Sequence, residues 1–132
     1  MANKKYLLNN QDMSQFIANG YLLLKPDYPA GLHQTIKKRT EYIFKSGDPG
    51  NQILEQVPEL YEIFDHPVVK GTLQSIIGLN YIMQPHRHCH VNMPDSKGQG
   101  WHQDGTPRKF QGWNHPWRRH QRSRMAMAFY YP

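Results

Sequence analysis

Hydrophobic positions in the first half of the chain recur at helical spacing and are separated by residues that end helices. Residues 11–19 predict a short helix that ends at Gly20, because glycine readily adopts the left-handed conformation found after a helix. Residues 30–46 predict a second, longer helix. Its apolar face is formed by Leu32, Ile36 and Ile43.

A short apolar run, residues 21–25, lies between these two helices and predicts a buried strand closed by Pro26. Two helical segments follow, one or two turns over 58–64 and a helix that opens at 65–67 and runs to Ile77. Proline is well suited to the first position of that helix, where no backbone donor is needed. We expect these helices to pack over a sheet without a chemical role.

The pattern changes near Asn80 from helical to alternating spacing. Residues 80–93 predict a strand, with Pro85 confining part of it to an edge or a bulge. Residues 100–105 and 124–131 predict two further strands of the same structure.

A chain of 132 residues makes one domain at most, here mainly helical over 1–79 and mainly stranded over 80–132. This order predicts the α+β class. No apolar run is long enough to span a membrane, and the N-terminus lacks the apolar segment of a signal peptide. The single cysteine, Cys89, excludes an internal disulfide and fits a reducing compartment, so we expect a cytoplasmic protein.

The net charge of +6 lies entirely after residue 104. Residues 1–104 hold equal numbers of cationic and acidic side chains, whereas residues 105–132 hold no acid. The cationic residues there are Arg108, Lys109, Arg118, Arg119, Arg122 and Arg124. Most lie in the Pro-, Gly- and Trp-rich stretch 106–123, which predicts a lid over a pocket, with a disordered tail as the alternative. The positive electrostatic field of these residues attracts anions but does not favour one anion over another.

The stretch His102-Gln103-Asp104 carries the clearest sign of chemistry. In a strand, side chains at i and i+2 point to the same face, so His102 and Asp104 would present an imidazole and a carboxylate together. Two histidines and one carboxylate form the facial triad that binds ferrous iron. We therefore expect His102 and Asp104 to be catalytic metal ligands; a hydrogen-bonded structural pair is the alternative.

Three more histidines, His86, His88 and His90, would share one face of the strand predicted over 80–93. Spacing of this kind can bind Zn²⁺ or another metal. A hydrogen-bonded lining near the site and plain surface histidines remain as alternatives.

Three pieces of sequence, 87–94 (RHCHVNMP), 101–105 (WHQDG) and 124–132 (RMAMAFYYP), resemble the phytanoyl-CoA dioxygenase family in order and separation. This family is a branch of the Fe(II)/2-oxoglutarate oxygenases. The resemblance covers most of this chain but about the first half of a family member. It implies N-terminal helices around part of a double-stranded β-helix, or jelly roll, that is incomplete here.

The resemblance also implies a chemistry, in which Fe(II) and 2-oxoglutarate, with ascorbate as reductant, hydroxylate a small or lipid-like molecule or one held on an acyl carrier. In the family, the residue between the ligands contributes to the 2-oxoglutarate site, which marks Gln103. An aromatic residue on the strand after the lid does likewise, which marks Phe129 or Tyr130.

Family members continue into a segment with a second histidine ligand and an arginine for 2-oxoglutarate, and neither is evident here. We therefore expect a truncated fragment that binds metal weakly, lacks coupled turnover and self-associates through exposed strand edges. Two alternatives remain. One is a basic nucleic-acid-binding module that stacks bases on Trp113, Trp117 and Tyr130, although no known nucleic-acid motif supports it. The other is a catalytically inert fragment.

Overall fold

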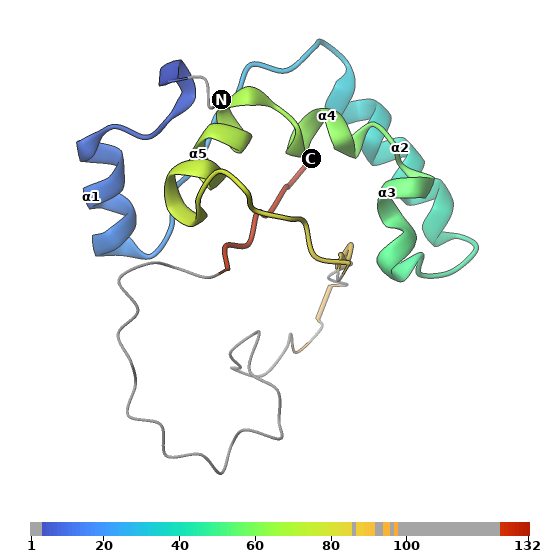
Figure 1. The fold of residues 1–132 in the computed structure, drawn as a ribbon. Coiled ribbons are helices and arrows are strands. Elements are labelled where there is room, and N and C mark those ends of the chain that lie inside the picture. Colours follow the sequence, from blue (N-terminus) through green and yellow to red (C-terminus); the bar gives the residue numbers. More distant parts are fainter. Residues whose placement is uncertain (1–3, 86, 92–93, 96, 98–124) are drawn as a thin grey trace. The chain divides into compact units, whose positions relative to one another are not determined.

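The computed structural model describes residues 4–85, 87–91, 94–95, 97 and 125–132 (Figure 1). The chain divides into two compact units, one formed by Met1–Cys89 with Arg122–Pro132 and the other by His90–Gln121. Nearly all described residues belong to the first unit, and the architecture below is that of this unit.

Helices account for all the regular structure in the described residues. Two are short 3₁₀ turns and five are α-helices. In chain order they are η1 (Lys4–Tyr6), α1 (Asn10–Asn19), α2 (Leu32–Phe44), η2 (Gly50–Gln52), α3 (Ile53–Gln56), α4 (Leu60–Phe64) and α5 (Pro67–Ile77). The helices expected over 11–19, 30–46, 58–64 and 67–77 are thus present with small shifts at their ends. None of the described helices is long and apolar enough to cross a membrane.

The predicted α+β class, with part of a jelly roll, is wrong for the described part of the chain. Residues 21–25, the described residues of 80–91, and residues 125–132 contain no strand, and residues 100–105 lie outside the described range. Alternation of side chains is a local property, but a strand also needs a neighbouring backbone to accept and donate hydrogen bonds. We expected the chain to self-associate through exposed strand edges. Because the described residues contain no strand, they offer no such edge.

The ends of α1 and α5 follow local chemistry. The Asn9 side chain accepts a hydrogen bond from the Asp12 backbone N–H (2.9 Å), and the Asp12 carboxylate accepts one from the Asn9 N–H (3.3 Å). This capping box satisfies two backbone donors that the first turn leaves free. At the other end of α1, Gly20 adopts φ 79°, as expected for a residue that ends a helix. At α5, His66 Nδ1 accepts from the Val68 N–H (3.2 Å).

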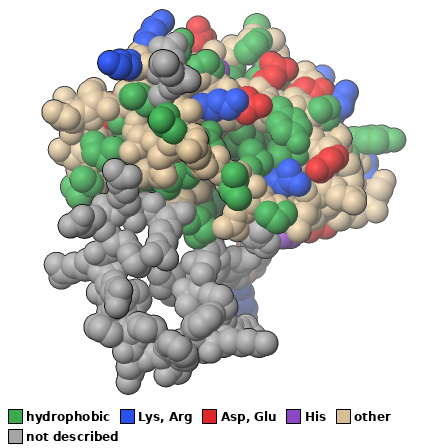
Figure 2. Space-filling model, in the orientation of Figure 1, with side chains coloured by type: hydrophobic (Ala, Val, Ile, Leu, Met, Phe, Trp, Pro, Cys, Tyr) green, Lys and Arg blue, Asp and Glu red, His purple; other side chains and the backbone are tan. Residues whose placement is uncertain are grey.

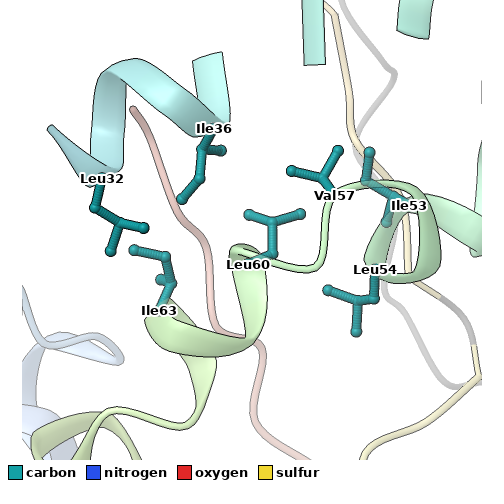
Figure 3. Close-up of a cluster of buried hydrophobic side chains, with 7 residues drawn as sticks. All are labelled: Leu32, Ile36, Ile53, Leu54, Val57, Leu60 and Ile63. Carbon is teal, nitrogen blue, oxygen red and sulfur yellow. The ribbon is translucent and has the colours of Figure 1, made fainter. Parts of the chain in front are cut away.

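A hydrophobic core forms between α2, α3 and α4 (Figure 3). Leu32 and Ile36 of α2 point toward the side chains of α4, and Val57 fills the turn between α3 and α4. The buried members are Leu32, Ile36, Ile53, Leu54, Val57, Leu60 and Ile63. Burial of each such side chain contributes about 1.5–3 kcal/mol. Cys89 and Tyr130, which lie outside the helices, also pack against this core.

The N-terminal turn η1 packs closely on α5. A Cβ at Gly71 would lie 2.6 Å from the Tyr6 carbonyl carbon, so only glycine fits beneath this backbone. Two residues later, the Leu8 N–H donates to Ser75 Oγ (3.0 Å), and that hydroxyl donates to the Gly71 carbonyl (2.9 Å). The chain before α1 is therefore held by main-chain contacts as well as by apolar packing.

Candidate functional site

The expected iron ligands His102 and Asp104, and the expected co-substrate residue Gln103, lie outside the described residues. Within the described ranges, no group of three or more His, Cys, Asp or Glu side chains is arranged to hold a metal ion. Two of the predicted site residues, Phe129 and Tyr130, are described. Tyr130 is the described site residue from which further contacts extend.

Tyr130 is joined to α2 by a short hydrogen bond. Its hydroxyl lies 2.7 Å from Nδ1 of His33, the second residue of that helix. The two rings are nearly parallel, with an interplanar angle of 22° and 5.7 Å between centroids. The neighbouring Phe129 side chain is exposed. Of the two aromatic candidates, Tyr130 is the one whose polar group is held in place.

Two more rings extend this contact into a ring cluster of Tyr28, His33, His66 and Tyr130. Tyr28 meets His33 edge to face at 5.4 Å and meets His66 at 5.0 Å. The Tyr28 hydroxyl donates to the Ile63 carbonyl at the end of α4 (3.3 Å). The cluster thus connects the segment before α2, the start of α2, the start of α5 and the C-terminal segment.

Burial controls the chemistry of the two phenols in the ring cluster. It raises the pKa of the Tyr28 hydroxyl above its ordinary value. Burial also raises the pKa of the Tyr130 hydroxyl, with a smaller contribution from the neighbouring Tyr28. A phenol is already protonated at neutral pH and burial moves its pKa further from neutrality, so both groups act as neutral hydrogen-bonding groups. The cluster can orient a ligand, but it supplies no phenolate as a base or a metal ligand.

A second set of contacts holds residues 87–89 against the helices. The Arg87 N–H donates to Asn51 Oδ1 (3.0 Å), and its guanidinium pairs with Glu55 (3.2 Å). Arg87 and Cys89 are half-buried, whereas His88 and His90 are exposed. The period-two arrangement of side chains that we expected is therefore present here without a strand. His86 lies outside the described residues.

Cys89 is a free thiol packed against the core. Burial raises its pKa, and the negative charge of Asp48 adds to the effect. Because the thiolate is the form that binds metals and attacks electrophiles, this environment favours an inert thiol. Cys89 therefore contributes to packing against this core.

Sequence reasoning singled out Tyr130 but missed Tyr28, His33 and His66. His33 and Tyr130 are 97 residues apart, and no local spacing links them. His66 has a local signal, because it directly precedes Pro67 at a helix start. That signal indicates a capping role and not a place in a ring cluster.

Comparison with known proteins gives no match to any family, to any curated protein or to any solved structure. His102 and Asp104 offer an imidazole nitrogen and a carboxylate oxygen, and both suit Fe²⁺. The residue types therefore fit iron.

Proposed function

We propose that this chain carries two iron ligands, His102 and Asp104, of an Fe(II)/2-oxoglutarate-dependent oxygenase of the phytanoyl-CoA dioxygenase type. The observation that carries the proposal is the His-Gln-Asp spacing at 102–104, flanked by the two other pieces of the family resemblance. A nitrogen and a carboxylate ligand leave room in the coordination sphere of iron for other groups. When bound, iron would activate O₂, the oxidant for hydroxylation, and 2-oxoglutarate would supply two electrons as it is decarboxylated to succinate.

The remaining residues bind and orient. By the resemblance, Gln103 and either Phe129 or Tyr130 contribute to 2-oxoglutarate binding. Tyr130 is the favoured aromatic residue because its hydroxyl is neutral at physiological pH and held by His33. When His33 carries its proton on Nδ1 and donates it to this oxygen, the Tyr130 O–H is left to donate to a carboxylate. Phe129 has no such group. The ligand role of Tyr130 thus depends on its phenol hydroxyl as a hydrogen-bonding group.

The proposed substrate is a small or lipid-like molecule, free or on an acyl carrier. Its supporting feature is the run of cationic residues after residue 104, which attracts a carboxylate or a phosphate. We propose a cytoplasmic location on the basis of the single cysteine.

Metal binding tests the proposal directly. Mn²⁺ suits the same nitrogen and carboxylate donors and does not oxidise in air as Fe²⁺ does, so its free concentration can be followed by electron paramagnetic resonance. We expect the chain to bind Mn²⁺, and His102→Ala and Asp104→Ala to abolish that binding. Asp104→Glu should weaken it, because the longer arm displaces the carboxylate. His115→Ala is the matched control, and its binding should equal that of the wild type.

The co-substrate roles need a second measurement. Addition of 2-oxoglutarate should increase the bound fraction of Mn²⁺, and Tyr130→Phe should reduce this increase while leaving binding of the metal alone unchanged. Wild-type metal binding in both His102→Ala and Asp104→Ala would reject the ligand assignment. An increase that Tyr130→Phe leaves intact would reject the role of Tyr130 alone.

The second candidate is a nucleic-acid-binding module, favoured by the excess of arginine and lysine in residues 105–132. Binding of this kind weakens steeply with salt, because each neutralised phosphate releases counterions. Titration of a single-stranded oligonucleotide at two salt concentrations separates the two functions. Binding with a steep salt dependence, unaffected by His102→Ala, would favour the nucleic-acid function.

A further inference from the structure

The C-terminal segment 125–131 turns every odd-numbered side chain toward solvent. The exposed fraction rises along the segment, and all four side chains are large and apolar. They are Met125 (38%), Met127 (54%), Phe129 (66%) and Tyr131 (83%), here called the outer row. Of the even positions, Ala126 and Tyr130 are half-buried, whereas the small Ala128 side chain is exposed. The segment thus has one face toward the helices and one apolar face without cover among the described residues.

Tyr130 fixes this orientation. Its ring packs against the core of α2, α3 and α4, and its hydroxyl is hydrogen-bonded to His33. Because neighbouring side chains of an extended segment point to opposite faces, anchoring of Tyr130 holds Phe129 and Tyr131 outward. Hydrophobic side chains reach the surface at several places on the face shown in Figure 2, interspersed with charged ones. The outer row differs because residues 125–132 contain no charged side chain.

We propose that the outer row is a docking surface for a second copy of this chain, with the two segments packed face to face and antiparallel. An antiparallel pairing centred on Ala128 places Met127 opposite the partner's Phe129. The same pairing places Met125 opposite the partner's Tyr131. Each contact joins a thioether to an aromatic ring, which is a favourable pair, and the two-fold axis makes every contact twice. The order Met-x-Met-x-Phe-x-Tyr is therefore complementary to itself when reversed.

Charge favours the antiparallel arrangement over the parallel one. The sequence that precedes Met125 is strongly basic and carries no acid after residue 104. A parallel pair would bring these two basic sequences to the same end and would also place methionine on methionine. In an antiparallel pair the two basic sequences lie at opposite ends of a seven-residue segment, about 20 Å apart. This separation exceeds the screening length of about 8 Å at physiological salt, so their repulsion is weak.

The size of the surface determines the strength of the dimer. Stable protein interfaces bury about 1,600 Å² in total, and weak transient ones bury less than about 1,200 Å². One face of a seven-residue segment belongs to the weak class. We expect a dimer with a dissociation constant on the order of 10–100 μM, which forms independently of any iron site.

Sedimentation equilibrium of the full 132-residue chain, from about 1 to about 300 μM, tests the proposal. The wild type should pass from monomer to dimer across this range. Met127→Glu should raise the dissociation constant about tenfold or more, because it opposes a charge to an aromatic ring. Ile82→Glu is the matched control, since Ile82 is an 85% exposed apolar side chain outside the outer row, and it should dimerise like the wild type. Circular dichroism checks that both variants keep their helices.

A pair of double variants tests the register. Met127→Lys with Phe129→Glu should dimerise, because each lysine then faces the partner's glutamate at position 129. Met127→Lys with Phe129→Lys should stay monomeric through repulsion. A wild type that is monomeric at every concentration, an equal effect of Met127→Glu and Ile82→Glu, or dimerisation of the double-lysine variant would each overturn the proposal. Metal binding is a separate measurement, so its failure leaves this result unaffected.

Discussion

The Tyr130 hydroxyl lies 2.7 Å from Nδ1 of His33 and joins the C-terminal segment to the start of α2 across 97 residues. The other two rings of the ring cluster, Tyr28 and His66, extend this contact, and the Tyr130 ring packs on the core. It therefore has consequences for stability as well as for any ligand that Tyr130 binds.

Removal of this hydroxyl should destabilise the fold modestly. Tyr130→Phe keeps the ring in the core and deletes one hydrogen bond, so we expect the free energy of unfolding to fall by about 1 kcal/mol. Urea unfolding followed by circular dichroism measures the change. Tyr131→Phe is the control, because its hydroxyl belongs to an 83% exposed side chain. In His33→Ala, the Tyr130→Phe change should have a smaller effect, and additive losses would contradict the hydrogen bond as a stabilising link.

Gly71→Ala should destabilise the contact between η1 and α5. Alanine is the better helix former by about 1 kcal/mol, but its Cβ would overlap the Tyr6 carbonyl group, and overpacking typically costs about 1–3 kcal/mol. We expect a net loss of stability, with faster hydrogen exchange at the Leu8 amide, which is bonded to Ser75. Tyr6→Ala should not rescue the variant, because the clash is with main-chain atoms. A more stable Gly71→Ala protein would contradict this packing.

Alkaline pH should destabilise the chain through Tyr28. An unfolded tyrosine ionises near pH 10, whereas burial raises the pKa of Tyr28 in the folded chain. As pH rises past about 10, Tyr28 loses its hydroxyl proton in the unfolded state before it does so in the folded state. The unfolded state then binds fewer protons than the folded state. The contribution of Tyr28 to the free energy of unfolding should therefore be constant below about pH 9 and fall above about pH 10. Urea unfolding from pH 9 to 11 should show a smaller fall for Tyr28→Phe than for wild type, with Tyr131→Phe as the unaffected control.

Cys89 should react slowly with alkylating reagents in the folded chain. Burial and the charge of Asp48 raise its pKa, so little thiolate is present at pH 8. Iodoacetamide labelling followed by mass spectrometry should be at least about threefold slower in the native chain than in the same chain unfolded in urea. Equal rates in the two states would show that the thiol is not protected.

The helical part could be predicted from local patterns. Apolar spacing and Gly20, Pro67 and Gly78 place the helices nearly where they lie, because a helix satisfies its own backbone hydrogen bonds within one segment. Asn9 and Asp12 also match the pattern of a helix capping box, because the side chain of each bonds to the backbone N–H of the other, three residues away.

The strands could not be predicted in the same way. In residues 87–90 the expected alternation of side chains is present, yet no strand forms among the described residues. Arg87 instead finds partners on Asn51 and Glu55. A sheet depends on a second backbone at hydrogen-bonding distance, and the alternating pattern of one segment carries no information about that backbone.

The sequence by itself determined α1, α2, α4 and α5, with their ends to within a few residues, and the residue types that suit iron, because each depends on neighbours within a few positions. It did not predict η1, η2 or α3. Only the tertiary structure decided that Tyr130 meets His33, that Tyr28 and His66 surround them, and that Met127 and Phe129 face outward. These relationships join residues far apart in the chain. They arise from packing on a shared core, which no local spacing specifies.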